Sequence, residues 1–219
     1  KMAIPTFPNH SLPPLRKILI VGNGGREESL AWALSQNKEV EKIWISPGNG
    51  GTKENPKCER ITEHSQGNKK LSELCLSYEI DLVVIGPEAP LASGLADELR
   101  DAGIVVFGPG AEGAKLEASK VWAKDLMQEA GIPTANYWAV RTEQEGIDIV
   151  NKLQCPMVVK ADGLASGKGV TVPKSVEATI QAIKETFNGR FGEAGNKLVL
   201  EELLEGPEVS VFALTDGEK

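Results

Sequence analysis

In the first half of the chain, short continuous apolar runs alternate with segments of helical periodicity. Four of these runs have the length of buried strands: residues 18–21, 42–45, 82–85 and 104–107. Three segments between them have the spacing of helices: residues 26–36, 71–78 and 91–102. Fully apolar strands that alternate with helices are typical of a parallel sheet covered on both faces. We therefore predict an α/β fold that begins with a doubly wound parallel sheet.

The second half has a different pattern, which indicates a second domain. A helix predicted over residues 114–130 places Trp122, Leu126 and Ala130 on one face and leads into it. Strands are predicted at residues 137–140, 157–161, 169–172, 197–201 and 209–214. Helices are predicted at residues 143–153 and 176–187. Hairpin-like turns and long loops join these strands, so we expect an α+β unit with an antiparallel sheet.

The two ends of the chain carry their own signals. Residues 1–14 contain four prolines among polar residues and lack the apolar core of a signal peptide, which predicts a mobile tail over residues 1–15 on a cytoplasmic protein. Residues 215–219 carry the Asp-Gly signal of a hairpin turn, but no returning strand follows. We therefore expect a chain truncated inside a domain. The predicted domains are residues 16–115 and 116–219.

Composition excludes several classes of function. The 219 residues carry a formal charge of -7, which argues against a broad nucleic-acid surface. No apolar stretch approaches the roughly 20 residues of a membrane span. Three widely separated cysteines and two histidines predict neither a disulfide framework nor a zinc site, and oxygen-ligated magnesium stays open. Phosphate binding must therefore be local, at loops and helix ends.

A glycine-rich loop with two lysines, residues 160–169, is the strongest chemical signal. Lys160 ends an apolar run and Lys168 lies in the loop, so that two ammonium groups and exposed N–H groups can converge on a triphosphate. A Walker A loop is excluded, because Asp162 and Gly169 stand where that motif needs Gly and Ser or Thr. The loop joins two predicted strands and would act as a flap over a ligand. An ordinary glycine-rich hairpin with surface lysines is the open alternative.

Four more loops follow the predicted parallel strands, at residues 22–26, 47–51, 86–88 and 108–110. The carboxyl ends of parallel strands share one edge, where such sheets bind ligands, so these loops predict a pocket that includes Arg26 and Glu88. A dinucleotide site fits poorly. Glu27 replaces the third glycine of the dinucleotide fingerprint, and no acid follows the second strand to hold a ribose.

These motifs together resemble a known family. Residues 22–27 (Gly-Asn-Gly-Gly-Arg-Glu), 47–49, 86–91, 107–109 and 160–169 (Lys-Ala-Asp-Gly-Leu-Ala-Ser-Gly-Lys-Gly) closely resemble phosphoribosylamine–glycine ligases, also called glycinamide ribonucleotide synthetases. The resemblance runs from about residue 16 to the end and implies a doubly wound domain followed by an ATP-grasp domain with a lid at about residues 137–200. It also implies the reaction of purine biosynthesis in which glycine, ATP and 5-phosphoribosylamine give glycinamide ribonucleotide, ADP and phosphate through glycyl phosphate.

The resemblance also implies which residues bind ATP. They are Lys120, Lys160, Gly163, Ser166, Gly167, Lys168, Gly169, Glu201, Glu202, Leu204 and Glu208. Lys160 is expected to meet the α- and β-phosphates, and Lys120 to reach the nucleotide from the other side. Main-chain groups around Leu204 are expected to pair with adenine, Glu201 to lie nearby, and Glu208 to accept hydrogen bonds from the ribose hydroxyls. The loop is expected to close over the phosphates and exclude water.

For 5-phosphoribosylamine, the implied residues belong to the first domain. They are Gly24, Gly25, Arg26, Asn49, Pro87 and Glu88. The two glycine N–H groups and Arg26 are expected to bind the phosphate, and Asn49 and Glu88 the ribose. One position departs from the family, which commonly has histidine where this chain has Glu28. Either this carboxylate points away from the phosphate or the site is arranged differently.

No catalytic residue is assigned to this chain. The resemblance implies that Mg²⁺ or Mn²⁺ accompanies ATP and that the metal ligands lie beyond residue 219, so we expect the 219-residue chain alone not to turn over substrate. We expect a monomer whose partners are ATP, glycine and 5-phosphoribosylamine, with no nucleic acid and no membrane. Two alternatives are another ATP-grasp carboxylate–amine ligase and a non-catalytic nucleotide-binding fragment.

Overall fold

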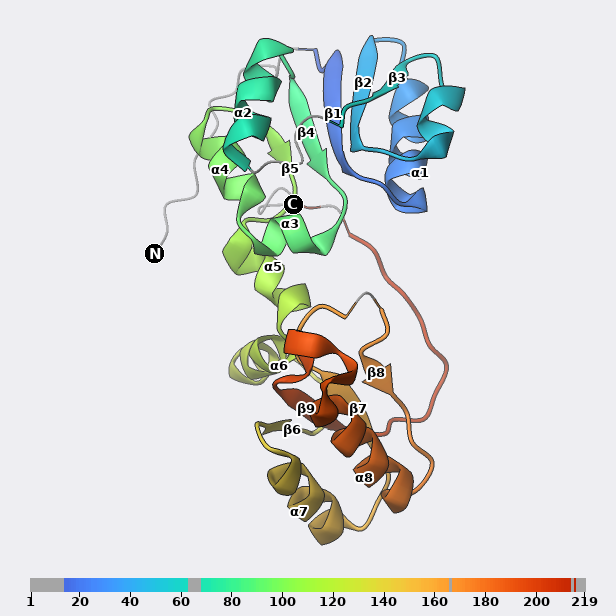
Figure 1. The fold of residues 1–219 in the computed structure, drawn as a ribbon, viewed down its shortest axis with the longest axis vertical. Helices are drawn as coiled ribbons and strands as arrows, with labels where there is room; N and C mark the ends of the chain where they lie inside the picture. Colours follow the sequence, from blue (N-terminus) through green and yellow to red (C-terminus); the bar gives the residue numbers. More distant parts are fainter. Residues whose placement is uncertain (1–13, 63–67, 166, 214, 216–219) are drawn as a thin grey trace. The chain divides into compact units, whose positions relative to one another are not determined.

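The computed structural model describes residues 14–62, 68–165, 167–213 and 215. Within it the chain forms two compact units, residues 1–118 and residues 119–219 (Figure 1). Most of the predicted tail, and most of the predicted turn at residues 215–219, lie outside the described residues. None of the helices in the described part has the length and apolar character that crossing a membrane requires.

A five-stranded parallel sheet forms the centre of the first unit, in the order β3-β2-β1-β4-β5. Its strands are β1 (Lys17–Gly22), β2 (Lys42–Pro47), β3 (Cys58–Arg60), β4 (Leu82–Ile85) and β5 (Val106–Phe107). The order runs outward from β1 in both directions, as in a doubly wound sheet, so the predicted fold class is confirmed. The short edge strand β3 was not predicted.

Helices cover both faces of this sheet. They are α1 (Gly25–Ser35), α2 (Asn68–Ser77), α3 (Glu88–Ala92), α4 (Leu95–Asp101) and α5 (Ala111–Ala118), with a short 3₁₀ helix η1 (Gly50–Glu54). Ile18 and Ile20 pack with Ala31 of α1 on one face. Leu19 packs with Leu99 of α4 on the other. The alternation along β1 explains why the whole strand is apolar.

The predicted helix at residues 91–102 is two helices in the structure, so this prediction was wrong. Gly94, the N-cap of α4, has a left-handed backbone conformation with φ 88°. A right-handed α-helix cannot continue through such a residue, so the predicted helix is divided there. The predicted helix at residues 114–130 is also two helices, α5 and α6 (Lys120–Glu129). Ser119 separates them in an extended conformation, and its hydroxyl caps α6 by accepting a hydrogen bond from Trp122 N at 3.2 Å.

The second unit has a four-stranded sheet in the order β6-β9-β7-β8, antiparallel throughout as predicted. Its strands are β6 (Tyr137–Val140), β7 (Met157–Ala161), β8 (Val170–Thr171) and β9 (Leu198–Glu202). Its other elements are α7 (Glu143–Leu153), α8 (Val176–Glu185), a π-turn η2 (Thr186–Arg190) and a 3₁₀ turn η3 (Gly192–Gly195). One sheet face packs Met157 and Leu200 against Val150 of α7 and Ile183 of α8. The other face carries Lys160 and Glu201 together with the buried residues Val158 and Val199.

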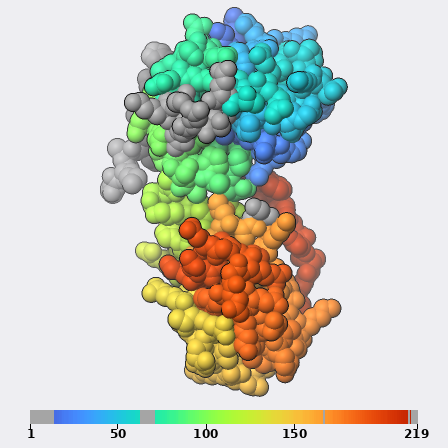
Figure 2. All heavy atoms as spheres, in the orientation of Figure 1, coloured from blue at the N-terminus to red at the C-terminus, as the bar shows by residue number. Residues whose placement is uncertain are grey.

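The strand predicted at residues 209–214 is absent from the described residues, so this prediction was wrong. Residues 203–213 form neither helix nor strand, and Val209 and Phe212 are 79% and 93% exposed. In Figure 2 the segment that follows β9, coloured red, is an extended single stretch of chain. A strand gains its stability from a hydrogen-bonded neighbour, and this segment pairs with none among the described residues.

Candidate functional site

Lys160 and Glu201 meet on the face of the second sheet that is turned away from α7 and α8. They lie on the adjacent strands β7 and β9, in which Val158 is paired with Glu201 and Lys160 with Val199. Alternate residues share a face, so both side chains point away from the core formed with α7 and α8. Lys160 Nζ lies 2.8 Å from Glu201 Oε2. The structure therefore brings together two residues predicted to bind the nucleotide.

A second lysine, which the sequence analysis did not single out, binds the same oxygen. Lys124 extends from α6, and its Nζ lies 3.2 Å from Glu201 Oε2. The side chains of Lys124 and Glu201 are only 10% and 7% exposed, whereas that of Lys160 is 27% exposed. Glu201 Oε1 is buried and has no hydrogen-bond partner among the described residues. A buried acceptor without a donor is costly, so this oxygen is available to a ligand or water donor.

Asp162 fastens the start of the glycine-rich loop to the N-terminus of α6. Its Oδ1 accepts hydrogen bonds from Val121 N at 2.8 Å and from the Ser119 hydroxyl at 3.0 Å. Its main-chain oxygen accepts from Lys120 N at 3.2 Å. Lys120 Nζ in turn donates to Gly163 O at 3.4 Å. The structure thus places Lys120 against the base of the loop that follows Lys160.

The glycine-rich loop is closed at its base by main-chain hydrogen bonds. Ala161 N donates to Gly169 O at 2.8 Å, and Gly163 N donates to Ala194 O of η3 at 3.3 Å. Lys168 is exposed, and Gly167 has φ 75°. Ser166, predicted to bind ATP, lies outside the described residues. The loop therefore has a fixed base and presents the Lys168 ammonium group near its end.

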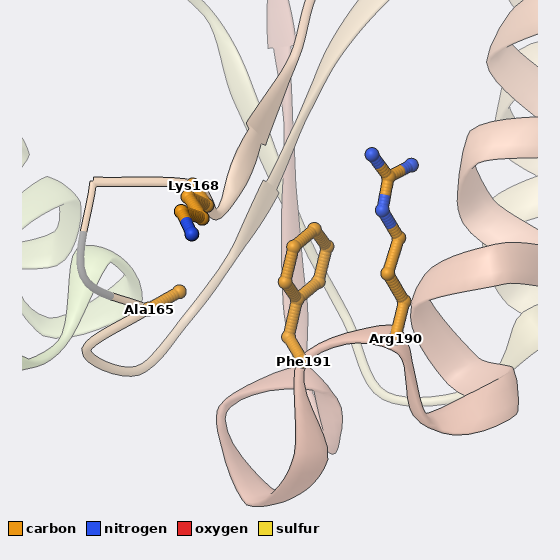
Figure 3. Close-up of a pocket in the computed structure, with 4 residues that line it drawn as sticks. All are labelled: Ala165, Lys168, Arg190 and Phe191. Atoms are coloured by element: carbon orange, nitrogen blue, oxygen red, sulfur yellow. The ribbon is translucent and has the colours of Figure 1, made fainter.

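Lys168 faces a hollow of about 470 Å³ lined by Ala165, Lys168, Arg190 and Phe191 (Figure 3). The ring of Phe191 stands between the side chains of Lys168 and Arg190 in this view. Arg190 lies over the ring with its guanidinium carbon 5.2 Å from the ring centre, and it pairs with Glu185 at 2.6 Å. Arg190 and Phe191 were not predicted from the sequence to line a site. An aromatic residue beside an arginine in a glycine-rich segment was the available signal.

The remaining predicted nucleotide residues follow or end β9. Glu202 Oε2 accepts a hydrogen bond from Asn136 Nδ2 at 2.9 Å. Leu204 and Glu208 are exposed, and within the described part of the chain neither forms a hydrogen bond or ion pair with the lysines. The structure therefore gathers Lys160 and Glu201 but does not bring Leu204 and Glu208 to them.

In the first unit, the predicted phosphosugar residues lie at the carboxyl edge of the sheet. Gly24 N donates to Glu27 Oε2 at 2.7 Å, so this N–H group is already satisfied within the chain. Asn49 Nδ2 donates to the main-chain oxygens of Asn23 and Gly24, at 3.1 and 3.4 Å. Gly25 is exposed at the first position of α1, where helix N–H groups lack partners within the helix. Of the two glycines predicted to bind the phosphate, Gly25 is therefore the one whose N–H group can bind an anion.

Arg26 and Glu88 form an ion pair beside this loop. Arg26 Nη1 lies 2.9 Å from Glu88 Oε1, and Glu88 follows Pro87, the N-cap of α3. The hydrogen bond to Glu88 raises the pKa of Arg26. The pKa of Glu88 is lowered by a hydrogen bond from its own backbone N–H and then by Arg26. Both side chains are partly exposed, so both charges remain accessible to a ligand.

Glu27 fills the space between two strand ends. It is buried, and its Oε1 lacks a hydrogen-bond partner among the described residues. A Cβ added at Gly86, after β4, would lie 2.1 Å from this oxygen, and one at Gly22 would lie 2.4 Å from Glu27 Cγ. Only glycine leaves room for the carboxylate at these positions. Glu27, which replaces the third glycine of the dinucleotide fingerprint, therefore packs against Gly22 at the end of β1 and Gly86 after β4.

Glu28, the position that departs from the family, faces η1. Thr52 Oγ1 donates to its Oε2 at 3.4 Å, and Thr52 is buried. Of the two arrangements left open by the sequence, the structure therefore shows Glu28 engaged with the 3₁₀ turn after β2. As for metal sites, the described residues contain no group of three His, Cys, Asp or Glu side chains placed to hold an ion.

The two units are a doubly wound domain followed by the beginning of an ATP-grasp domain. The solved biotin carboxylase domain of 2-oxoglutarate carboxylase from Hydrogenobacter thermophilus has this fold, with a TM-score of 0.65 at 18% identity over 87% of this chain and 45% of that one. Residues 118–219 match the family model described as phosphoribosylglycinamide synthetase, ATP-grasp (A) domain. Residues 16–117 match the N domain of the same synthetase. The chain belongs to the phosphoribosylglycinamide synthetase family.

Two relatives show how much of the family's length is present. The phosphoribosylamine–glycine ligase of a Nostoc species is 51% identical over 202 residues, which are 92% of this chain and 47% of the relative. The crystal structure of phosphoribosylamine–glycine ligase from Thermotoga maritima has a TM-score of 0.69 at 31% identity, over 87% of this chain and 44% of that one. The chain therefore spans about half the length of these relatives.

Proposed function

We propose that this chain carries the nucleotide site and the phosphosugar site of a ligase that joins glycine to 5-phosphoribosylamine. The overall reaction consumes ATP and yields glycinamide ribonucleotide, ADP and phosphate. The 51% identity to a phosphoribosylamine–glycine ligase supports this substrate set. The observation that carries the proposal is the placement of Lys160 on Glu201 beside a glycine-rich loop whose start is fastened to Lys120 by Asp162.

The residues of the second unit fit a nucleoside triphosphate. Of the two lysines that contact Glu201, Lys160 is the more exposed. It can exchange the Glu201 carboxylate for a phosphate oxygen. Glu201 Oε1 is a buried acceptor that lacks a donor among the described residues, and Lys168 adds a positive charge at the loop. ATP supplies the phosphoryl group that turns the glycine carboxylate into an acyl donor. The lysines neutralise the phosphate charge, and closure of the loop excludes water from the acyl phosphate.

For the phosphosugar, we place the phosphate at the N-terminus of α1, beside Gly25 and Arg26. The unpaired N–H groups of the first helical turn and the Arg26 guanidinium group favour an anion there. Glu88 holds Arg26 in place at 2.9 Å and offers its other oxygen to a hydroxyl of the sugar. Asn49 braces the main chain of Asn23 and Gly24. No metal ligand is proposed among the described residues, and no step is derived through a metal.

The test uses the protein expressed from its complete gene. We expect ADP formation to require both glycine and 5-phosphoribosylamine, the latter generated in the assay from ribose 5-phosphate and ammonia. K160M should lower kcat/KM for ATP by roughly 100-fold, because a charge that contacts the phosphates is lost. The control K152M replaces an exposed lysine of α7 and should change nothing. ADP formation that ignores 5-phosphoribosylamine would instead indicate a different carboxylate–amine ligase.

A further inference from the structure

Two ammonium groups share a single carboxylate oxygen in the second unit. Lys124 and Lys160 lie 3.2 and 2.8 Å from Glu201 Oε2. The three side chains carry a net charge of +1, and Glu201 and Lys124 are almost completely buried. Removing the cations from a buried carboxylate is costly, because water cannot replace them. One lysine would be sufficient to neutralise Glu201, so the second requires an explanation.

The two lysines differ in how firmly they are held. Lys124 Nζ also donates to Thr134 Oγ1 at 2.7 Å and to Ala135 O at 3.4 Å. It lies 5.8 Å from the ring centre of Tyr137. Lys160 Nζ has Glu201 as its hydrogen-bond partner among the described residues, and its side chain is the more exposed of the two. Lys124 is therefore the fixed cation, and Lys160 is the one that can move.

We propose that Lys124 is a positioning residue for nucleotide binding, a permanent counter-ion of Glu201 that frees Lys160 to bind a phosphate group. The inference rests on the proposed function, because it requires a nucleotide phosphate to be the new partner of Lys160. In the free protein Glu201 holds both lysines. When the phosphate draws Lys160 away, Lys124 keeps the buried carboxylate neutralised and fixed on β9. Without Lys124, the same movement leaves Glu201 without a cation.

A structural role for Lys124 has to be separated from this one. Through Thr134 and Ala135, Lys124 also joins α6 to the segment before β6, and a simple tether would stabilise the unit without involving Glu201. The two roles predict different coupling between Lys124 and Glu201. A counter-ion matters only while Glu201 is charged, whereas a tether matters equally when Glu201 is replaced by glutamine. A double-mutant cycle measures this difference.

The experiment measures the Kd for ADP by titration calorimetry in the protein expressed from its complete gene. K124M should weaken ADP binding about tenfold in the wild-type background and less than about threefold in the E201Q background. K124R keeps the charge and should bind ADP within about threefold of wild type. The matched control K152M should bind like wild type. Equal losses in both backgrounds, or no loss in K124M, would overturn the inference.

Two further observations keep the test decisive. K124Q retains a donor for Thr134 but lacks the charge, so it should bind ADP as weakly as K124M even if K124M folds poorly. A crystal structure with bound ADP should show Lys160 Nζ on a phosphate oxygen while Lys124 stays on Glu201. Lys160 still paired with Glu201 in that complex would also overturn the inference. A wild-type protein that binds no ADP would reject the proposed function itself, whereas binding that is insensitive to Lys124 rejects only this step.

Discussion

The Asp162 carboxylate caps a helix that lies far from it in the sequence, since its Oδ1 accepts a hydrogen bond from Val121 N at 2.8 Å. The first N–H groups of a helix have no partner within the helix, and Asp162 satisfies one of them from another element. Lys160 lies two residues before Asp162, and Lys120 begins the capped helix. One hydrogen bond therefore fixes the spacing of two lysines proposed to bind one nucleotide.

We predict that D162A destabilises the second unit by about 1–2 kcal/mol, the usual cost of losing a helix cap. It should also raise the KM for ATP, because Lys120 and the base of the loop lose their connection. D162N retains an acceptor for Val121 and should cost less than half as much. Urea unfolding and steady-state kinetics measure both effects. A D162A variant as stable as wild type would contradict the capping role.

The Arg26–Glu88 pair predicts a small dependence of stability on pH. The lowered pKa of Glu88 means that its stabilising contribution is fully present above the ordinary glutamate pKa and is lost as pH falls through the lowered value. E88Q should therefore be less stable than wild type at about pH 7, by less than about 1 kcal/mol because the pair is exposed. The difference should vanish in acid. Melting temperatures of the two proteins across this range check the sign.

The three cysteines should react very differently with a thiol reagent. Burial raises the pKa of Cys75 to about 11, and burial followed by the charge of Glu28 raises the pKa of Cys58. Cys155 is exposed. At about pH 8 only a small fraction of Cys75 is thiolate, and thiolate is the reactive form. Titration of the 219-residue chain with Ellman's reagent should show one fast thiol in the native state, none in C155S, and three in the wild-type chain after denaturation.

Gly86 should be intolerant of even a methyl group. A Cβ there would lie 2.1 Å from Glu27 Oε1, which is closer than two non-bonded atoms can approach. G86A should destabilise the first unit by roughly 1–3 kcal/mol through overcrowding. In an E27A background the same change should cost much less, because the crowded carboxylate is gone. Additive losses across the four proteins in urea unfolding would show that the strain lies elsewhere.

Much of the architecture could be predicted from the sequence. The strands at residues 18–21 and 82–85 are continuous apolar runs that need cover on both faces, and helical segments alternate with them, so a doubly wound sheet follows from the pattern along the chain. The loop between β7 and β8 could be predicted for a similar local reason, because glycines and lysines between two short apolar runs favour a turn over a helix. Where a local pattern is sufficient to choose a conformation, the prediction agrees with the structure.

Other features depend on contacts that no local pattern contains. Cys58–Arg60 is a strand only because β2 lies beside it, whereas residues 209–213 find no neighbour in the described part of the chain and stay unpaired despite their apolar residues. Ser119 interrupts a helical pattern because Asp162 and its own hydroxyl cap α6 there.

The Lys124–Glu201–Lys160 cluster is the clearest feature that depends on the tertiary structure. Its members come from α6, β9 and β7. Lys160 and Glu201 could be named from the sequence, but nothing in the sequence pattern connects Lys124 with them. Local sequence determines which segments become strands and helices, because backbone preference and apolar spacing act over a few residues. Only the packed sheet decides which charges meet, because the energy of a buried ion pair depends on distances between side chains that are remote along the chain.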